Sequence, residues 1–489
     1  MTVAWTGEER MLIGGKLRMA ASGATFETLN PATEEVLGRA ADGGPADMDA
    51  AISAARNAFD TTSWSTDLAL RVTCLRQLKS AFERHADEIR AMTVAEAGSP
   101  LSFTYSAQLD EPVNGLGWVA TLAEEYEWEH DLGDASPLGI PSHRWVRREA
   151  TGVVGAITPW NVPHQINLAK LGPALAAGNT VVLKPAPDTP WCGTVLGRLI
   201  AEETDIPPGV VNVVTSTDHA LGEQLATDPR VDLITFTGST ATGRRVMAAA
   251  APSLKKVFLE LGGKSAFVVL EDADFRGAIG TAAFTVCTHA GQGCAITTRL
   301  VVPRSRFDEA AELAAGTLTK LPAGDPTDPG IICGPLISAR QRDRVEGYLK
   351  LALEEGGQFV CGGGRPADQD RGFFVEPTLI VGLDNSARVA QEEIFGPVLV
   401  LIPHDGDDDA VALANDSPYG LSGSVWSQDR DRALSVAHRI RTGTIGVNGG
   451  LWYSPDVPFG GYKQSGIGRE MGMAGFEEYL ETKSLAEPA

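Results

Sequence analysis

The chain has 489 residues, of which 43% are hydrophobic, so we expect a globular protein of two or three structural units rather than a disordered one. Its 41 basic and 63 acidic residues give a net charge of −22, which disfavours nucleic acid and anionic membranes as partners because both would repel it. The polar N-terminus, the absence of an apolar run of the ~18 residues that a membrane span needs, and cysteines and histidines without metal-ligand spacing predict a cytoplasmic protein with free thiols and no bound metal.

Helices are predicted from Asp47 to about Trp128, because apolar residues recur there at helical spacing, as at Leu75, Leu78 and Phe82. The periodicity fails between residues 129 and 149, where Gly, Pro and Ser accumulate. A short alternating run, His143 to Arg148, indicates an edge strand or a hairpin arm that leaves the domain body.

Short apolar runs alternate with helix-like segments between residues 150 and 270. The five runs are Val153–Ile157, Thr180–Leu183, Val210–Val214, Leu233–Phe236 and Val257–Leu259. Continuous apolar strands separated by helices are typical of a doubly wound parallel sheet, which binds ligands at the carboxyl ends of its strands. A second series of strands and helices is predicted from about Ala266 to Asn448, with helices near 274–290, 307–318 and 339–355.

Two segments carry residues that could perform covalent catalysis. Glu260 begins Glu-Leu-Gly-Gly-Lys at the end of an apolar run, and Cys294 ends Gly-Gln-Gly-Cys. A thiol and a carboxylate are the nucleophile and the base of a two-step reaction. Taken alone, Cys294 could equally be an inert buried thiol, Glu260 a solvated carboxylate at a strand end, and Asn161 an ordinary turn residue.

These two segments, together with Thr158–Asn161, Lys184–Ala186 and Glu393–Val398, closely resemble the aldehyde dehydrogenase superfamily from about Asn30 to the C-terminus. The resemblance implies an α/β fold with three parts. They are a Rossmann-like cofactor domain (1–128 and 150–259), an α/β catalytic domain (260–470) and a small oligomerisation β-arm (129–149 and 471–489). It also implies a homodimer or homotetramer.

The resemblance assigns the catalytic roles residue by residue. Cys294 would attack the aldehyde to form a thiohemiacetal and then a thioester, while Asn161 and the backbone N–H of Cys294 would hold the oxyanion. Glu260 would activate water for hydrolysis of the thioester, and burial would raise its pKa toward the working range. Lys170 and Glu470 would lie near the path of the proton or the water. Cys287 is better interpreted as a packing residue.

The cofactor site departs from the usual dinucleotide fingerprint, since the turn Thr237–Gly243 replaces GxGxxG between a strand and a helix. The resemblance implies that Lys184 binds the adenosine ribose and that Glu393 binds the nicotinamide ribose. The other residues implied to bind cofactor are Thr158, Pro159, Trp160, Ala186, Pro187, Gly222, Phe236, Gly238, Ser239, Leu261, Gly262 and Phe395. Many NAD-specific members have Glu where this chain has Pro187. NAD⁺ is therefore the first choice and NADP⁺ is not excluded, with Asp188 as a partial substitute for the missing carboxylate.

By family position, an aldehyde tunnel would lie between two walls. One wall is formed by Val162, Gln165 and Ala169, and the other by Trp452, Tyr453 and Phe459. None of these side chains is basic, so we expect medium-chain or aromatic aldehydes to be preferred over succinate semialdehyde. Two rival functions are a CoA-acylating semialdehyde dehydrogenase, which would lack the base at Glu260, and a catalytically silent binding or structural protein, which would have lost the nucleophile or the base.

Overall fold

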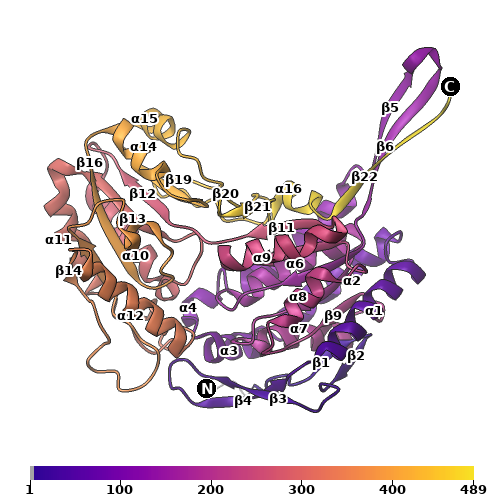
Figure 1. Ribbon diagram of the computed structural model, residues 1–489, viewed down its shortest axis with the longest axis horizontal. Helices are drawn as coiled ribbons and strands as arrows, with labels where there is room; N and C mark the ends of the chain where they lie inside the picture. The colour runs from indigo at the N-terminus through magenta and orange to yellow at the C-terminus, as the bar shows by residue number, and fades with distance from the viewer. Residues whose placement is uncertain (1–4) are drawn as a thin grey trace.

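The computed structural model describes residues 5–489, which form two α/β lobes and an arm that projects from one of them (Figure 1). The first lobe holds an eight-stranded sheet and the second a seven-stranded sheet. The C-terminus lies toward the tip of the arm, away from both lobes. This is the mixed α/β architecture that the sequence predicts.

The sheet of the first lobe has the order β2–β1–β9–β8–β7–β10–β11–β21. Its five central strands are parallel and are those that the apolar runs predict: β7 (Val153–Ile157), β8 (Thr180–Lys184), β9 (Val211–Val213), β10 (Leu233–Thr237) and β11 (Lys256–Glu260). Almost every residue of these strands is buried, as expected for a sheet covered on both faces. The prediction of a doubly wound parallel sheet is confirmed.

The edge strands of this sheet are short, antiparallel and absent from the sequence prediction. β1 (Met11–Ile13) and β2 (Lys16–Arg18) extend one edge, and β21 (Gly466–Ile467) pairs with β11 at the other. Strands of two or three residues are too short to show a period. β21 lies within the range predicted for the catalytic domain yet bonds to the first sheet, and the domain boundaries stay a prediction.

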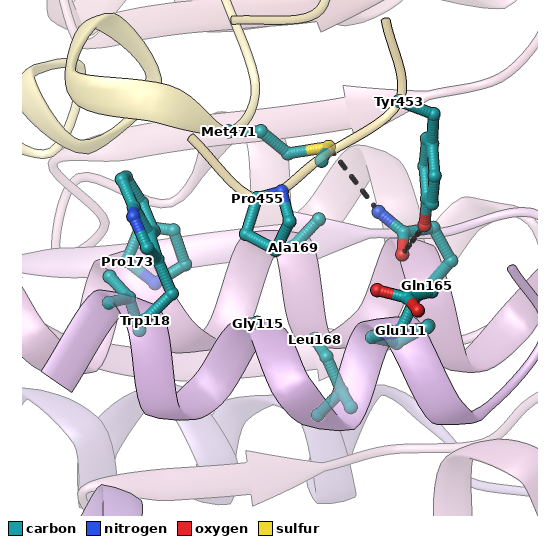
Figure 2. A pocket seen from close by; sticks show the side chains of 12 residues that line it. Glu111, Gly115, Trp118, Gln165, Leu168, Ala169, Pro173, Tyr453, Pro455 and Met471 are labelled. Carbon is teal, nitrogen blue, oxygen red and sulfur yellow. Dashed lines mark hydrogen bonds between the residues drawn. The ribbon is translucent and has the colours of Figure 1, made fainter. Parts of the chain in front are cut away.

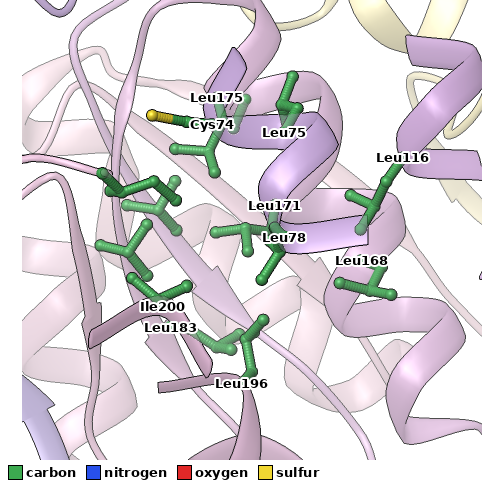
Figure 3. Close-up of a cluster of buried hydrophobic side chains, with 14 of the residues drawn as sticks. Cys74, Leu75, Leu78, Leu116, Leu168, Leu171, Leu175, Leu183, Leu196 and Ile200 are labelled. Atoms are coloured by element: carbon green, nitrogen blue, oxygen red, sulfur yellow. The ribbon is translucent and has the colours of Figure 1, made fainter. Parts of the chain in front are cut away.

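Helices cover both faces of the first sheet, and the predicted helical region is confirmed. They are α1 (Pro45–Thr61), α2 (Leu68–Arg84), α3 (Ala86–Ala97), α4 (Leu101–Thr104), α5 (Asp110–Glu125), α6 (Pro163–Ala177), α7 (Pro190–Glu203), α8 (Ala220–Thr227) and α9 (Thr240–Ala250). Leucines of α2, α5, α6 and α7 pack together over Leu183 of β8 (Figure 3). Within residues 5–489, none of the helices has the length and apolar character required to cross a membrane.

Helix α6 is buried on nearly every side, because α2 and α5 pack against one side of it and the sheet against another. Pro163 occupies its first turn, where no backbone N–H is needed, and Gly178 ends it in the left-handed conformation at φ +96°. A helix that is apolar all round belongs in a core. Its three buried polar residues, His164, Asn167 and Lys170, therefore need partners inside the protein.

The second lobe has a seven-stranded sheet in the order β14–β15–β16–β13–β12–β18–β19, parallel except at β14. Its strands are β12 (Ser265–Val269), β13 (Thr297–Pro303), β14 (Gln358–Cys361), β15 (Thr378–Val381), β16 (Val398–His404), β18 (Gly423–Trp426) and β19 (Gly446–Val447). Its helices are α10 (Phe275–Cys287), α11 (Phe307–Leu318), α12 (Ala339–Glu354), α13 (Arg388–Gln391), α14 (Asp407–Asn415) and α15 (Arg430–Ala437). The predicted second series and its three helices are confirmed.

The arm is a three-stranded antiparallel sheet in the order β22–β6–β5. β5 (Glu129–Ala135) and β6 (Ser142–Ala150) form the hairpin, and β22 (Leu480–Pro488) pairs with β6 along its whole length (Figure 1). The predicted hairpin arm is confirmed. Short elements complete the fold: the hairpin β3 (Thr25–Leu29) and β4 (Val36–Ala41), the pair β17 (Tyr419–Gly420) and β20 (Tyr462–Lys463), and helix α16 (Gly472–Glu477).

Candidate active site

Three cavities lie in series where the parallel strands of the first sheet end. The outer cavity, of about 590 Å³, follows the ends of β7, β8 and β10 and the start of α9. The middle cavity, of about 430 Å³, shares Trp160 with it, and the inner cavity measures about 240 Å³. The middle and inner cavities have three lining residues in common: Asn161, Glu260 and Cys294. The structure thus brings the predicted nucleophile, base and oxyanion donor together at one junction.

Cys294 lies between a 3₁₀ turn, η3 (Thr288–Gly291), and the start of β13, and it is partly exposed to the two cavities. Burial from bulk solvent and the nearby carboxyls, led by Glu260, raise the pKa of its thiol well above the usual value. The resting thiol is therefore neutral and needs a base to become a nucleophile. Cys287, by contrast, is fully buried in the core of the second lobe, where burial raises its pKa to about 12.

Glu260 is the last residue of β11 and is 1% exposed. Burial, followed by the negative charge of Glu470, raises the pKa of its carboxyl well above the usual value, while Lys170 opposes this shift. Within residues 5–489 its Oε1 atom has no hydrogen-bond partner. A buried carboxyl with one free oxygen and a raised pKa is poised to exchange a proton rather than to hold a permanent charge.

Asn161 follows β7, and hydrogen bonds hold both its side-chain amide and its backbone carbonyl. Its side-chain Nδ2 donates to the backbone carbonyl of Gln292 at 2.9 Å, and its own carbonyl accepts from Gln108 Nε2 at 2.8 Å. The carbonyl of Gln292 fixes which end of the Asn161 amide is NH₂, so a second N–H remains for a ligand at the junction. Sequence reasoning missed Gln108 and the bracing role of Gln292, because both act through contacts distant in the sequence.

Lys170 and Glu470 form a buried ion pair beneath Glu260. Lys170 Nζ bonds to a carboxyl oxygen of Glu470 and, at 3.0 Å, to the hydroxyl of Thr235. Both charged side chains are at most 5% exposed. The two opposite charges compensate each other, which makes their burial tolerable. The pair also places a carboxyl and an ammonium close to Glu260. The structure thus places these two residues together near Glu260, and their role in a proton or water path stays a prediction.

All the residues predicted to bind cofactor line the outer or the middle cavity. The outer cavity has Thr158, Pro159, Trp160, Lys184, Ala186, Pro187, Gly222, Phe236 and Gly238, and the middle cavity has Ser239, Leu261, Gly262, Glu393 and Phe395. The buried Lys184 Nζ lies 3.5 Å from the carbonyl of Ser216, and burial lowers its pKa to about 8. Asp188 lines the same cavity 3.9 Å from Arg340, and burial raises its pKa.

Helix α12 holds the segment that carries Glu393 and Phe395, which the sequence did not reveal. Gln341 Nε2 donates to the carbonyl of Phe395 at 2.8 Å, and Arg344 donates to the carbonyl of Glu393 at 2.6 Å. The Glu393 carboxyl accepts from the backbone N–H of Gly263 at 3.0 Å. Both Gln341 and Arg344 also line the middle cavity. The two contacts from α12 join residues 54 and 49 positions apart, and the contact to Gly263 joins residues 130 positions apart, so only the fold reveals them.

Aromatic and aliphatic side chains from both lobes form the wall of the inner cavity. Five of the residues predicted for the aldehyde tunnel line this cavity: Val162, Gln165, Trp452, Tyr453 and Phe459. Trp452 stacks on Phe459 with ring centroids 5.3 Å apart. Residues from other segments complete the wall and were not predicted: Phe103, Ala107, Ile166, Thr285, Thr288, His289, Ala295, Ile296 and Met471.

Ala169 differs from the prediction, because it lines a separate small hollow of about 40 Å³ between α5, α6 and the loop before Met471 (Figure 2). The Tyr453 hydroxyl bonds to Gln165 Oε1, and Gln165 Nε2 bonds to the sulfur of Met471 at 3.5 Å. These three side chains line both spaces and stand between them. Ala169 is thereby separated from the cavity that holds Cys294.

Comparison with known proteins identifies relatives along the whole chain. A family model described as the aldehyde dehydrogenase family matches residues 18–485. Geranial dehydrogenase of Castellaniella defragrans is 41% identical over 480 residues, 98% of each chain. The crystal structure of a mutant betaine aldehyde dehydrogenase from Staphylococcus aureus, in complex with NAD⁺ and with a BME-modified cysteine, has a TM-score of 0.95 at 34% identity and covers 99% of this chain and 96% of its own. Mutant aldehyde dehydrogenase C from Pseudomonas syringae, crystallised with NAD⁺ and octanal, has a TM-score of 0.93 at 38% identity and covers 99% and 98%.

Proposed function

Because this chain belongs to the aldehyde dehydrogenase family, we propose that it oxidises a medium-chain or aromatic aldehyde to the carboxylic acid, with NAD⁺ as the hydride acceptor and Cys294 as the covalent nucleophile. The observation that carries the proposal is the junction of two unlike cavities. Cys294, Glu260 and Asn161 line both the middle cavity and the apolar inner cavity. A thiol placed there can meet an aldehyde from one side and a cofactor from the other.

Acylation begins when Cys294 loses its proton, which the neighbouring Glu260 carboxylate can accept. The sulfur attacks the carbonyl carbon, forms the C–S bond and moves the carbonyl electron pair onto oxygen. The free N–H of Asn161 and the backbone N–H of Cys294 stabilise this oxyanion, and one such donor can contribute on the order of 3 kcal/mol. Gln292 supports this role by holding the Asn161 amide in one orientation.

The nucleotide fits the residues of the outer and middle cavities. Helix α9 begins at Ser239 without an acidic residue in its first turn, so its amides and dipole suit a pyrophosphate. Two glycines of the lining have no room for a larger side chain. A Cβ atom added to Gly238 would lie 2.6 Å from the ring of Phe236, and one added to Gly262 would lie 2.6 Å from the Glu393 carboxyl. Lys184 and Glu393 would bind the two riboses. When bound, the nicotinamide accepts the hydride whose loss turns the thiohemiacetal into a thioester.

Pro187 leaves the ribose end of the site without a carboxylate three residues after Lys184, and the structure offers only a weak replacement. Asp188 lines the outer cavity, but burial raises its pKa and Arg340 lies 3.9 Å away, so its negative charge is partly neutralised. A 2′-phosphate would therefore meet little repulsion. NAD⁺ remains the proposed cofactor, and NADP⁺ is proposed as a usable second.

Deacylation uses Glu260 a second time. Its raised pKa lets it take a proton from water as that water attacks the thioester and releases the acid and the free thiol. The Lys170–Glu470 pair lies next to Glu260 and can pass the proton onward. The presence of this base supports hydrolysis rather than transfer of the acyl group to CoA.

The composition of the inner cavity supports an uncharged, largely apolar substrate. Its lining includes no Lys or Arg, and its two ionisable carboxyls, Glu260 and Glu470, would repel a substrate carboxylate. Trp452 and Phe459 offer aromatic faces for a ring or an alkyl chain. The relatives that act on geranial or bind octanal fit the same chemical class.

The arm is proposed as the oligomerisation element of a homodimer or homotetramer. Both outer strands of its sheet, β5 and β22, leave one edge unpaired within residues 5–489. Leu132, Leu138 and Ile140 on the hairpin are 48%, 101% and 63% exposed. Free strand edges and exposed apolar side chains together favour pairing with another copy. Light scattering after gel filtration tests this; a monomer at micromolar concentration would contradict it.

The experiment that tests the function is a turnover assay with both cofactors and a panel of aldehydes. Octanal, benzaldehyde, acetaldehyde and succinate semialdehyde are supplied in turn while the absorbance of the reduced nicotinamide is followed. We expect the highest kcat/KM for octanal or benzaldehyde with NAD⁺. Preference for succinate semialdehyde would contradict the substrate class, and no reduction with any aldehyde would contradict the function.

A further inference from the structure

His289 occupies an unusual position in the wall of the inner cavity. It lies in η3, five residues before Cys294, with a left-handed backbone at φ +48°. Its backbone N–H donates to the carbonyl of Ile332 at 2.9 Å, and its carbonyl accepts from the backbone and the side chain of Gln292 at 3.1 and 3.2 Å. The main chain is therefore fixed, and the imidazole lines the cavity beside the ring of Phe103.

The imidazole is buried without a hydrogen bond. His289 is 2% exposed, and within residues 5–489 neither Nδ1 nor Nε2 has a partner. His164 shows the usual arrangement, because it is also buried but its Nε2 bonds to the Thr93 hydroxyl at 2.9 Å. An unmet polar group in an apolar wall costs free energy unless something enters the cavity to satisfy it.

The protonation state defines what the ring can offer. Burial lowers the pKa of His289 to about 4 and outweighs the nearby backbone of Asn161, which acts to raise it. At neutral pH the imidazole is therefore uncharged and has one N–H donor and one nitrogen acceptor. Other polar side chains of this wall are already engaged: Thr285 donates to the carbonyl of Thr281 at 2.8 Å, and Gln165 bonds to Tyr453. Both ring nitrogens of His289, in contrast, remain free within residues 5–489 to bond to a molecule in the cavity.

We infer that His289 is a specificity residue that hydrogen-bonds an uncharged polar substituent of the aldehyde, such as a hydroxyl group. The inference rests on the proposed function, since it concerns the substrate of the same site. A hydroxyl matches both halves of a neutral imidazole, because it can donate to one nitrogen or accept from the other. The surrounding apolar wall accommodates the rest of the molecule, so the preferred substrate is an apolar aldehyde with one polar group away from the carbonyl.

The inference is tested by comparing the parent enzyme with one variant on pairs of substrates that differ by a hydroxyl group. The values of kcat/KM for benzaldehyde and its three hydroxy isomers, which place the hydroxyl at three distances from the carbonyl, are measured for the parent and for His289→Leu. Comparing the ratio of hydroxylated to plain substrate between the two enzymes cancels the intrinsic reactivity of each aldehyde. For at least one isomer we expect this ratio to fall about tenfold in the variant.

Two further variants keep the test decisive. His289→Asn tolerates the left-handed backbone better than Leu but is too short to reach the same group, so it should fold and lose the same preference. Thr285→Val removes a wall hydroxyl that is already bonded to the backbone and should leave the ratio unchanged. An unchanged ratio for all three isomers in both His289 variants overturns the inference, whereas retained octanal turnover shows that the proposed function stands independently.

Discussion

The two sides of Cys294 are built in different ways. On the cofactor side, strand ends, glycines and a few charged groups such as Lys184 and Glu393 line two cavities of about 590 and 430 Å³. On the other side, side chains from both lobes form one smaller cavity that is mainly apolar. Backbone geometry and charge thus define the first side, and packing defines the second. Charge substitutions should therefore change the choice of cofactor, whereas changes of volume should alter the choice of aldehyde.

Removal of the thiol should stop chemistry on both sides at once. Cys294→Ala is expected to lower turnover by on the order of 10⁴-fold or more, because no covalent intermediate can form. Binding of NAD⁺, measured by calorimetry, should remain nearly unchanged, since the thiol is not among the groups proposed to hold the nucleotide. Cys287→Ala is the matched control, because this thiol is buried in the core of the second lobe. Substantial activity in the first variant, or its loss in the second, would refute the assignment.

Glu260→Gln should separate the first half of the reaction from the second. A burst of about one equivalent of reduced cofactor per site is still expected, slower than in the parent because water must then accept the Cys294 proton. Steady turnover should follow, slowed by about 10²- to 10⁴-fold, because the attacking water lacks its base. Rapid-mixing absorbance measures both phases. Loss of the burst as well would show that no other group can replace Glu260 as the acceptor of the Cys294 proton.

The pH profile of turnover gives a second measurement on the same carboxyl. Since the pKa of Glu260 is raised, its basic form grows as pH rises, so turnover of the parent should increase toward alkaline pH and that of Glu260→Gln should not. The charge of Glu470 contributes to that raised pKa, so Glu470→Gln should move the profile toward lower pH. A profile that stays in place would place the titrating group elsewhere.

Pro187→Glu should change the cofactor side alone. A carboxylate near the adenosine ribose would meet the 2′-phosphate as a like charge, so kcat/KM with NADP⁺ should fall at least about tenfold more than with NAD⁺. Pro187→Gln has the same length without the charge and should leave the ratio of the two cofactors nearly unchanged. Equal effects of the two substitutions would mean that discrimination lies elsewhere, with Asp188 as the next candidate.

The same contrast explains which parts of the molecule could be predicted from the sequence. Strands β7 to β11 were predicted because buried parallel strands are uninterrupted apolar runs. The residues at their ends were predicted because they belong to short local motifs that resemble those of the family. Edge strands β1, β2 and β21 were missed because two or three residues show no period. The supports of the site, such as Gln108 and Arg344, were missed because they contact it only after distant segments come together.

The inner cavity shows the limit of prediction by position most clearly. The resemblance grouped Ala169 with Gln165 by family position, and the two residues share a face of α6. The structure separates them, because the Tyr453–Gln165 and Gln165–Met471 contacts stand between Ala169 and the cavity (Figure 2). His289 was missed because a buried histidine without a partner can be recognised only when all its neighbours are known.

Trp452→Ala tests whether packing determines the choice of aldehyde, and we expect it to have the smallest effect of these substitutions. Trp452 lines the inner cavity and stacks on Phe459 with an angle of 6° between the rings, so it could either contact substrate or merely brace its neighbour. If it contacts substrate, kcat/KM for benzaldehyde should fall about tenfold while that for acetaldehyde changes little, because only the larger aldehyde reaches the ring. If it only braces Phe459, both values should fall alike.

Trp426→Phe is the control, because Trp426 stacks on Phe267 in the core of the second lobe and does not line the cavity. Equal losses for the two aldehydes in Trp452→Ala would mean that this aromatic pair supports the loop and that the apolar contacts to substrate come from the opposite wall.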